Sequence, residues 1–201
     1  MRFLVCVKQV VDTSKMEVDP NTGRLNRNNA NSIINPLDLH ALEAALALRD
    51  QVGGTVTVLT MGPPQAEQVL QYAVSMGADD VYLATDRAFG GADTLATSYT
   101  LAAAIRKLGS FDLIFCGQES LDSNTAQIGP EVAAMLSMPD VSGAVDISYE
   151  REGYITVRRQ LSDEDEVLEM KLPALITTAE SLNRPRYPSV LGIMKKDHVE
   201  I

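Results

Sequence analysis

The sequence of 201 residues has no tryptophan, two histidines and two cysteines. His40 and His198 have no second ligand at metal-binding spacing, so we expect no metal site. Cys6 and Cys116 lie far apart in or at the end of apolar segments, and we expect free buried thiols there. The G-x-S-x-G and H-E-x-x-H signatures of catalytic sites are also missing. Any redox activity therefore has to come from a bound cofactor.

Long hydrophobic runs and an excess of positive charge are also absent. No apolar run approaches the roughly 18 residues that a membrane span requires. The opening segment MRFLVCVKQVVD is interrupted by Lys8 and Gln9, unlike a signal peptide. We therefore expect a cytoplasmic protein without direct membrane insertion. A net charge of −10 argues against nucleic acid as a partner, while 45% hydrophobic and 22% charged residues are ordinary for a globular protein.

Short apolar segments alternate with helical patterns over the first two thirds of the chain. The patterns predict strands at 3–7, 55–60, 81–85 and 113–116, and helices at 36–50, 64–76, 93–108 and 131–136. Asn35 is expected to cap the first helix, with Pro36 at its first position. The order predicts an α/β fold with a doubly wound, mostly parallel sheet. Ligands of such sheets bind beyond the carboxyl ends of the strands.

The pattern changes after about residue 140. Alternating segments at 144–149, 154–160 and 166–171 predict a small C-terminal β-hairpin extension, followed by a core strand at 174–178. The polar segment 14–31 is predicted to be a long loop or irregular hairpin, and 180–193 an exposed arm. We therefore divide the chain into an α/β domain at 1–179, which includes the hairpin at 144–171, and a terminal segment at 180–201.

A tract rich in amides and hydroxyls, CGQESLDSNTAQIGP at 116–130, directly follows a predicted strand. Small residues at the start of a helix leave backbone N–H groups free to bind an anion, and side chains such as Ser123, Asn124, Thr125 and Gln127 add donors. The tract is therefore a candidate cradle for phosphates. An ordinary helix cap with polar loop residues is the alternative. Pro130 allows a helix start near Asn124 or at Pro130 itself.

Two other loops lie on the same predicted edge of the sheet. In the tract 87–97, Gly90-Gly91 permits close approach of a ligand, and Asp93, Thr94 and Thr97 share a helix face. It matches no established nucleotide motif, and a flexible loop with a helix cap is its alternative. The segments 61–64 and 35–38 are candidates for an adenine or ribose pocket, or are simply turns and caps.

Together these segments resemble the β subunit of electron transfer flavoproteins, from residue 1 to about residue 196. The resemblance is carried by RFLVCVKQVVD, SIINPLDLHALEAAL, TVLTMGPPQA, MGADD, GQESLDSNTAQIGPEVA and LNRPRYPSV. Its most specific part is D-x-x-T-A-Q-x-G-P at 122–130. The resemblance implies an adenine nucleotide alpha hydrolase-like fold and a heterodimer with an FAD-containing α subunit.

The resemblance also implies a cofactor. Most members bind a structural AMP and carry electrons from acyl-CoA dehydrogenases. A subgroup binds a second FAD and bifurcates electrons from NADH to a dehydrogenase and a low-potential acceptor. The tract TDRAFGGADTLATS at 85–98 resembles that subgroup, so we expect FAD, with AMP as the alternative and a non-redox nucleotide-binding regulatory module as a second. The implied cofactor-binding residues are Cys6, Asn35, Asp38 and Met61 around the adenosine, Asp93, Thr94 and Thr97 on the flavin side, and Asp122, Asn124, Thr125, Ala126, Gln127, Ile128 and Gly129 near the phosphates.

The segment 179–190 matches the family's recognition loop, which docks on acyl-CoA dehydrogenases or related redox partners. The resemblance implies that Leu182 is an apolar anchor, with Arg184, Arg186 and Tyr187 nearby. The alternative is a proline-stiffened strap packed on its own domain. Family members usually continue beyond the motif at 193–195, so we expect a shortened arm and a correspondingly altered affinity for the α subunit.

Overall fold

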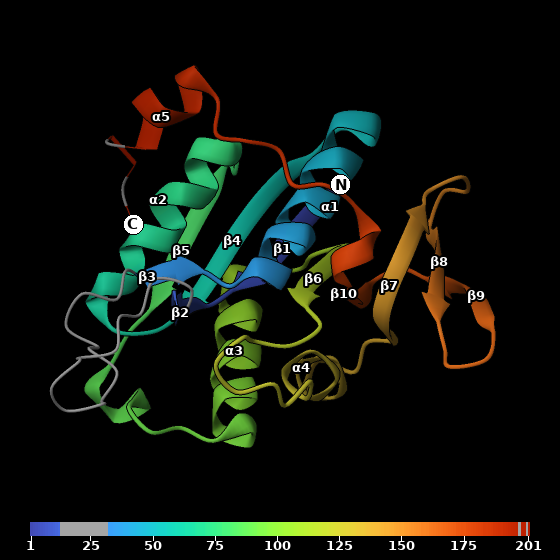
Figure 1. Cartoon of the computed structure of the whole chain (residues 1–201), viewed down its shortest axis with the longest axis horizontal. Helices are drawn as coiled ribbons and strands as arrows, with labels where there is room; N and C mark the ends of the chain where they lie inside the picture. Colours follow the sequence, from blue (N-terminus) through green and yellow to red (C-terminus); the bar gives the residue numbers. More distant parts are fainter. Residues whose placement is uncertain (13–31, 197, 200) are drawn as a thin grey trace, which may run out of the picture.

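The computed structural model describes residues 1–12, 32–196, 198, 199 and 201 (Figure 1). Its main sheet has eight strands in the order β5–β4–β1–β6–β10–β7–β8–β9. The strands are β1 Arg2–Val7, β4 Thr55–Met61, β5 Asp80–Ala84, β6 Leu113–Gly117, β7 Asp140–Ser148, β8 Tyr154–Gln160, β9 Asp165–Lys171 and β10 Ala174–Thr178. A second, two-stranded sheet pairs β2 Gln9–Val11 with β3 Ser32–Ile34.

Five α-helices accompany the sheet in the described part of the chain. They are α1 Pro36–Val52, α2 Glu67–Met76, α3 Thr94–Leu108, α4 Ile128–Leu136 and α5 Val190–Lys196. Within the same described residues, three short 3₁₀ turns lie at η3 Pro64–Ala66, η4 Arg87–Phe89 and η5 Glu180–Leu182. None of the described helices combines the length and the apolar character needed to cross a bilayer.

The sheet is parallel from β5 through β7, whereas β8 pairs antiparallel with both β7 and β9. This confirms the predicted doubly wound, mostly parallel α/β fold. The antiparallel strands form the predicted extension, which projects from one end of the molecule (Figure 1). The extension is continuous with the main sheet: β8 pairs with β7, β7 pairs with β10, and β10 pairs with β6.

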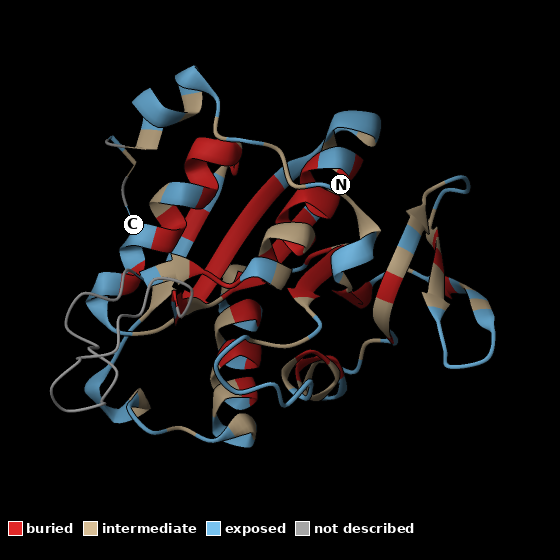
Figure 2. Ribbon diagram, viewed as in Figure 1, coloured by how far each residue is buried: buried red, intermediate tan, exposed pale blue. Residues whose placement is uncertain are grey.

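Alternate side chains of β1 build the two halves of the core. Phe3, Val5 and Val7 pack with residues of α1 and α2 on one face, whereas Leu4 and Cys6 pack with residues of α3 and α4 on the other. Because helices cover both faces, the central strands are almost completely buried (Figure 2). This two-sided burial is the reason that the central strands read as continuous apolar runs in the sequence.

The chain order places a topological switch point between β1 and β6. From β1 the chain steps outward to β4 and β5, and it then returns to add β6 on the other side of β1. Connections leave the two strands in opposite directions, so a crevice opens at their carboxyl ends. The fold therefore directs a ligand to the ends of β1 and β6.

Three predictions about local structure need correction. Asn35 and Pro36 occupy the predicted N-cap and first helical positions of α1, but the Asn35 side chain makes no capping hydrogen bond, because its amide bonds a distant loop instead. Helix α4 begins at Ile128, two residues before Pro130, rather than at either predicted start. The segment 180–193 contains no buried residue, as predicted for an exposed arm, but it lies along α1, and α5 then packs on α2. The loop predicted at 14–31 lies outside the described residues.

Candidate functional site

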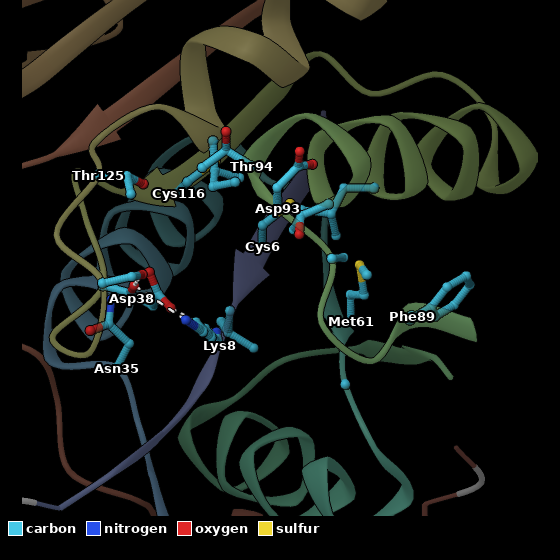
Figure 3. A pocket seen from close by; sticks show the side chains of 18 of the residues that line it. Cys6, Lys8, Asn35, Asp38, Met61, Phe89, Asp93, Thr94, Cys116 and Thr125 are labelled. Carbon is cyan, nitrogen blue, oxygen red and sulfur yellow. Dashed lines mark hydrogen bonds between the residues drawn. The ribbon is translucent and has the colours of Figure 1, made fainter. Parts of the chain in front are cut away.

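A pocket of about 1080 Å³ opens at the switch point (Figure 3). Its floor comes from the ends of β1 and β6, and its walls come from the starts of α1, α3 and α4 and from the loops after β4 and β5. It brings together eleven of the fourteen cofactor-binding residues predicted from the sequence, namely Cys6, Asn35, Asp38, Met61, Asp93, Thr94, Thr97, Thr125, Ala126, Gln127 and Ile128.

A buried carboxylate spans the crevice at the switch point. Asp38 Oδ2 accepts the backbone N–H of Lys8 at 2.7 Å, just beyond β1, and Oδ1 accepts that of Gly117 at 3.0 Å, at the end of β6. A β-carbon on Gly117 would lie 2.4 Å from Oδ1, so this approach requires glycine. Burial raises the pKa of Asp38 to about 7, although hydrogen bonds from Asn35, Lys8 and Gly117 and the Lys8 charge oppose the rise.

The loop after β6 is held to the N-terminal part of the chain. Asn35 donates from Nδ2 to the Glu119 carbonyl at 2.9 Å and accepts the Leu121 N–H at 3.1 Å. The Lys8 ammonium contacts Asp122 Oδ1 at 2.6 Å. Burial disfavours the charge of Asp122, but hydrogen bonds from Lys8 and Ser120 outweigh it and lower the pKa of this carboxyl. The pocket wall is therefore pinned at several points.

Two residues of this loop adopt left-handed backbone conformations. The φ angles are 49° at Asn124 and 53° at Ala126. Asparagine tolerates this region, but an alanine there carries a steric cost of about 1 kcal/mol. Strain retained in a loop that lines a cavity is typical of ligand-binding sites. The left-handed residue Ala126 lies two residues before α4, which begins at Ile128.

Three of the described helices begin at the pocket, and they differ in which side chains lie near the free backbone N–H groups of their first turns. The first turn of α1 contains Asp38, and Asp93 caps α3 by accepting the Ala96 N–H at 2.8 Å. Gln127 precedes α4 and makes no side-chain cap. Both Gln127 and Ile128 line the pocket. Of these three helix starts, α4 is thus the one without a side-chain cap and without a carboxylate before its fourth position, where Glu131 accepts the Ser98 hydroxyl at 2.8 Å. Pro130 has no N–H, so the backbone donors that α4 offers to an anion come from the residues before it.

Cys6 and Cys116 lie side by side on the pocket floor. They are direct partners in the parallel register of β1 and β6, and both face the α3 and α4 side of the sheet. A hydrogen bond with Cys6, together with burial and the nearby Cys6 and Asp38 charges, raises the pKa of the Cys116 thiol well above its ordinary value. Neither cysteine forms a disulfide. No group of three metal-ligating side chains occurs within the described ranges.

The far end of the pocket is formed by the segment after β5. Asp93 and Thr94 lie at the start of α3, Met61 ends β4, and Phe89 belongs to the segment after β5 (Figure 3). Sequence reasoning missed Lys8 and Phe89 as lining residues. Lys8 was detectable from its place immediately beyond a strand that ends at the ligand edge. Phe89 carries no comparable signal.

Three predicted contacts lie off the pocket wall: Asp122, Asn124 and Gly129. Asp122 instead pairs with Lys8. A β-carbon on Gly129 would lie 2.3 Å from Thr177 Cγ2, so this glycine allows α4 to pack closely on β10. Direct ligand contacts by these three residues stay predictions.

The predicted partner-recognition residues divide into two groups. Leu182 is half-buried and packs against the core, and Arg186 forms ion pairs with Glu43 at 2.9 Å and Asp50 at 2.8 Å on α1. Arg184 is exposed, and Tyr187 is 90% exposed. The segment is thus a strap on its own domain that also presents two exposed side chains.

The fold and pocket define an α/β protein with a ligand site at its switch point and an uncapped helix start suited to phosphate. A family model described as "Electron transfer flavoprotein domain" matches residues 22–201. The chain belongs to the electron transfer flavoprotein family, and its relatives place it among the β subunits.

Three curated relatives illustrate the match. The chain is 52% identical over 195 residues to the Caffeyl-CoA reductase-Etf complex subunit CarD of Acetobacterium woodii, covering 96% of this chain and 74% of that protein. It is 49% identical over 193 residues to the electron transfer flavoprotein subunit beta of Thermoanaerobacterium thermosaccharolyticum, with 96% and 74% covered. It is 47% identical over 199 residues to the Acryloyl-CoA reductase electron transfer subunit gamma of Anaerotignum propionicum, with 97% and 74% covered.

Proposed function

We propose that this β subunit binds FAD in the switch-point pocket and forms a heterodimer with an α subunit that carries another FAD. The heterodimer bifurcates electrons from NADH to a dehydrogenase and a low-potential acceptor. The family assignment supports the electron-transfer role, and the extent of the pocket supports a dinucleotide. Relatives from complexes named for Caffeyl-CoA and Acryloyl-CoA reductases agree with a reductase-type partner.

The observation that carries the proposal is one continuous cavity of about 1080 Å³. Pockets for drug-sized ligands span roughly 300–1,000 Å³, so this cavity is slightly larger than that range. A mononucleotide at the floor leaves the part lined by Phe89, Gly90, Gly91 and Asp93 without a ligand group. A dinucleotide extends into it.

The residues present fit such a ligand. Its phosphates are assigned to the uncapped start of α4, with Thr125 and Gln127 as additional donors. The adenosine is assigned to Cys6, Asn35, Asp38 and Met61, and the flavin side to the start of α3. Bound FAD supplies the electron chemistry, while these side chains orient it and exclude water.

The experiment uses the heterodimer produced with its α subunit. The purified complex is denatured, and the released small molecules are identified and counted by mass spectrometry. Two FAD molecules per heterodimer support the proposal. One FAD with one AMP overturns it in favour of a conventional carrier that shuttles electrons from acyl-CoA dehydrogenases. Uptake of ATP without any flavin would instead indicate a regulatory module.

A pair of variants tests the assignment of the flavin side. Thr97 lines the pocket, whereas Thr100 lies on the same helix, outside the lining, and donates to the Ala96 carbonyl at 2.9 Å. We expect Thr97→Val to weaken binding of the second FAD, because a hydrogen-bond donor is lost at the ligand. Thr100→Val is the matched control. Equal flavin content in the two variants would contradict the assignment.

The exposed side chains of the strap are proposed to contact the dehydrogenase. Tyr187→Ala and Arg184→Ala should slow electron transfer to the partner without changing flavin content, because neither side chain contributes to the core. Leu182→Ala is a poorer test, since this half-buried side chain also stabilises the domain. Unchanged transfer rates in both surface variants would remove this segment from the docking surface.

A further inference from the structure

The two cysteines of this chain are far apart in the sequence but adjacent in the fold. Residues 6 and 116 are direct register partners on adjacent parallel strands. Neighbouring strands lie about 4.8 Å apart, which is within the range over which two cysteines can share one bridging atom. Both side chains belong to the same core cluster and both contribute to the pocket lining. They therefore form a vicinal dithiol that is open to the cavity.

We propose that Cys6 and Cys116 form a dithiol site that binds trivalent arsenic compounds through two sulfur–arsenic bonds. Paired sulfur donors select soft, thiophilic elements over the hard cations that carboxylates prefer. The described residues offer no third ligand nearby that would complete a site for a metal ion. A trivalent organoarsenical is satisfied by two sulfurs, so it matches this pair.

The reaction is balanced without a redox step. Phenylarsine oxide and two thiols give one cyclic dithioarsinite and one water. Two arsenic–sulfur bonds form, the arsenic–oxygen bonds and two sulfur–hydrogen bonds break, and the oxygen leaves with both protons. Arsenic remains trivalent throughout, so no oxidant or reductant is required.

Because the dithiol lies on the pocket floor, arsenical binding should compete with binding of a nucleotide. An arsenical on the pocket floor occupies space assigned above to the adenosine, so it and the nucleotide exclude each other. This competition rests on the proposed function, whereas the dithiol itself does not. Phenylarsine oxide is a suitable probe because it is neutral and is not repelled by the acidic side chains of the pocket, Asp38, Asp86, Asp93 and Glu119.

The test uses the full, reduced chain with phenylarsine oxide and an excess of glutathione, followed by intact-protein mass spectrometry. Glutathione removes arsenic held by one thiol but not arsenic held by two. Because the sequence has two cysteines, one adduct per chain locates the site. Cys6→Ser and Cys116→Ser should each weaken retention roughly 100-fold or more, since the second bond becomes intermolecular.

A second measurement uses the wild-type chain, so that it is not affected by misfolding of a variant. Unfolding in urea separates positions 6 and 116, and retention should fall toward that of the single-cysteine variants. The proposal is wrong if glutathione strips arsenic from the folded chain, or if either serine variant retains it. Saturating FAD or AMP should slow arsenical uptake. Retention of arsenic without any protection by FAD or AMP would leave the dithiol site intact and refute the nucleotide assignment of the pocket.

Discussion

Replacement of Asp38 by asparagine tests the carboxylate at the switch point. In the wild type, the folded pKa of about 7 lies above the ordinary value of 3.8, because burial penalises the charged form. The folded state therefore binds more protons than the unfolded state between these two values. Stability from this group is fully present below pH 3.8 and is lost as the pH rises towards 7.

The magnitude follows from the width of that window. Each pKa unit corresponds to about 1.4 kcal/mol, so the span from 3.8 to about 7 gives roughly 4 kcal/mol as an upper bound. An asparagine side chain cannot ionise, so the Asp38→Asn variant loses this slope. The substitution also replaces one acceptor of the pair by a donor, and leaving the Lys8 or Gly117 N–H without a partner costs about 1–3 kcal/mol at every pH.

The assay is urea unfolding of both proteins at several values between pH 4.5 and 8. Because all other groups titrate alike in the two proteins, the difference between their unfolding free energies isolates Asp38. We expect the wild type to lose stability relative to the variant as the pH rises. Asp112→Asn is a control, because Asp112 Oδ2 accepts the Arg2 N–H at 2.7 Å outside the pocket. A pH-independent difference between wild type and Asp38→Asn would refute the reasoning.

Three further substitutions are best measured by urea unfolding. Gly117→Ala should destabilise the fold by about 1–3 kcal/mol, because its β-carbon would lie 2.4 Å from Asp38 Oδ1. Ala126→Gly should stabilise the empty chain by up to about 1 kcal/mol through relief of its positive φ, while weakening nucleotide affinity in calorimetry as the loop loosens. Arg186→Met should cost roughly 1–3 kcal/mol, because it leaves the buried Glu43 carboxylate without its cation.

Each of these variants has a control in the same part of the chain. Gly90→Ala adds a β-carbon at an ordinary 3.4 Å contact, Ala92→Gly changes a pocket alanine whose φ is not positive, and Arg184→Met removes an exposed cation from the strap. If a variant and its control change stability equally, the local explanation given for that variant is wrong.

The strands and helices were predictable because their signals are local. The apolar run at 113–116 and the helical spacing within 36–50 report burial directly, and the structure has elements at both places. The set of pocket residues was largely predictable too, since parallel strand ends meet at one edge. The position of β10 between β6 and β7 was not, because nothing near residue 174 records which strand it pairs with.

The missed details involve partners distant in sequence. Asn35 has the side chain of a helix cap, yet its buried amide forms hydrogen bonds with Glu119 and Leu121 of a loop distant in sequence. Gly129 fits a phosphate-binding motif, but its lack of a side chain serves the contact with Thr177. Arg186 was expected at a partner interface, and its ion pairs with two carboxylates of α1 were not predicted. Spacing along the chain carries no information on such choices.

The pairing of β1 with β6 has a consequence for synthesis of the protein. A nascent chain that has left the ribosome as far as residue 112 already contains Cys6, Lys8, Asn35 and Asp38, yet it has nothing to place opposite them. Until the sixth strand emerges, Asp38 has no Gly117 amide to bind and half of the cavity floor does not exist. The pocket is therefore completed late in synthesis, only when the centre of the sheet has formed.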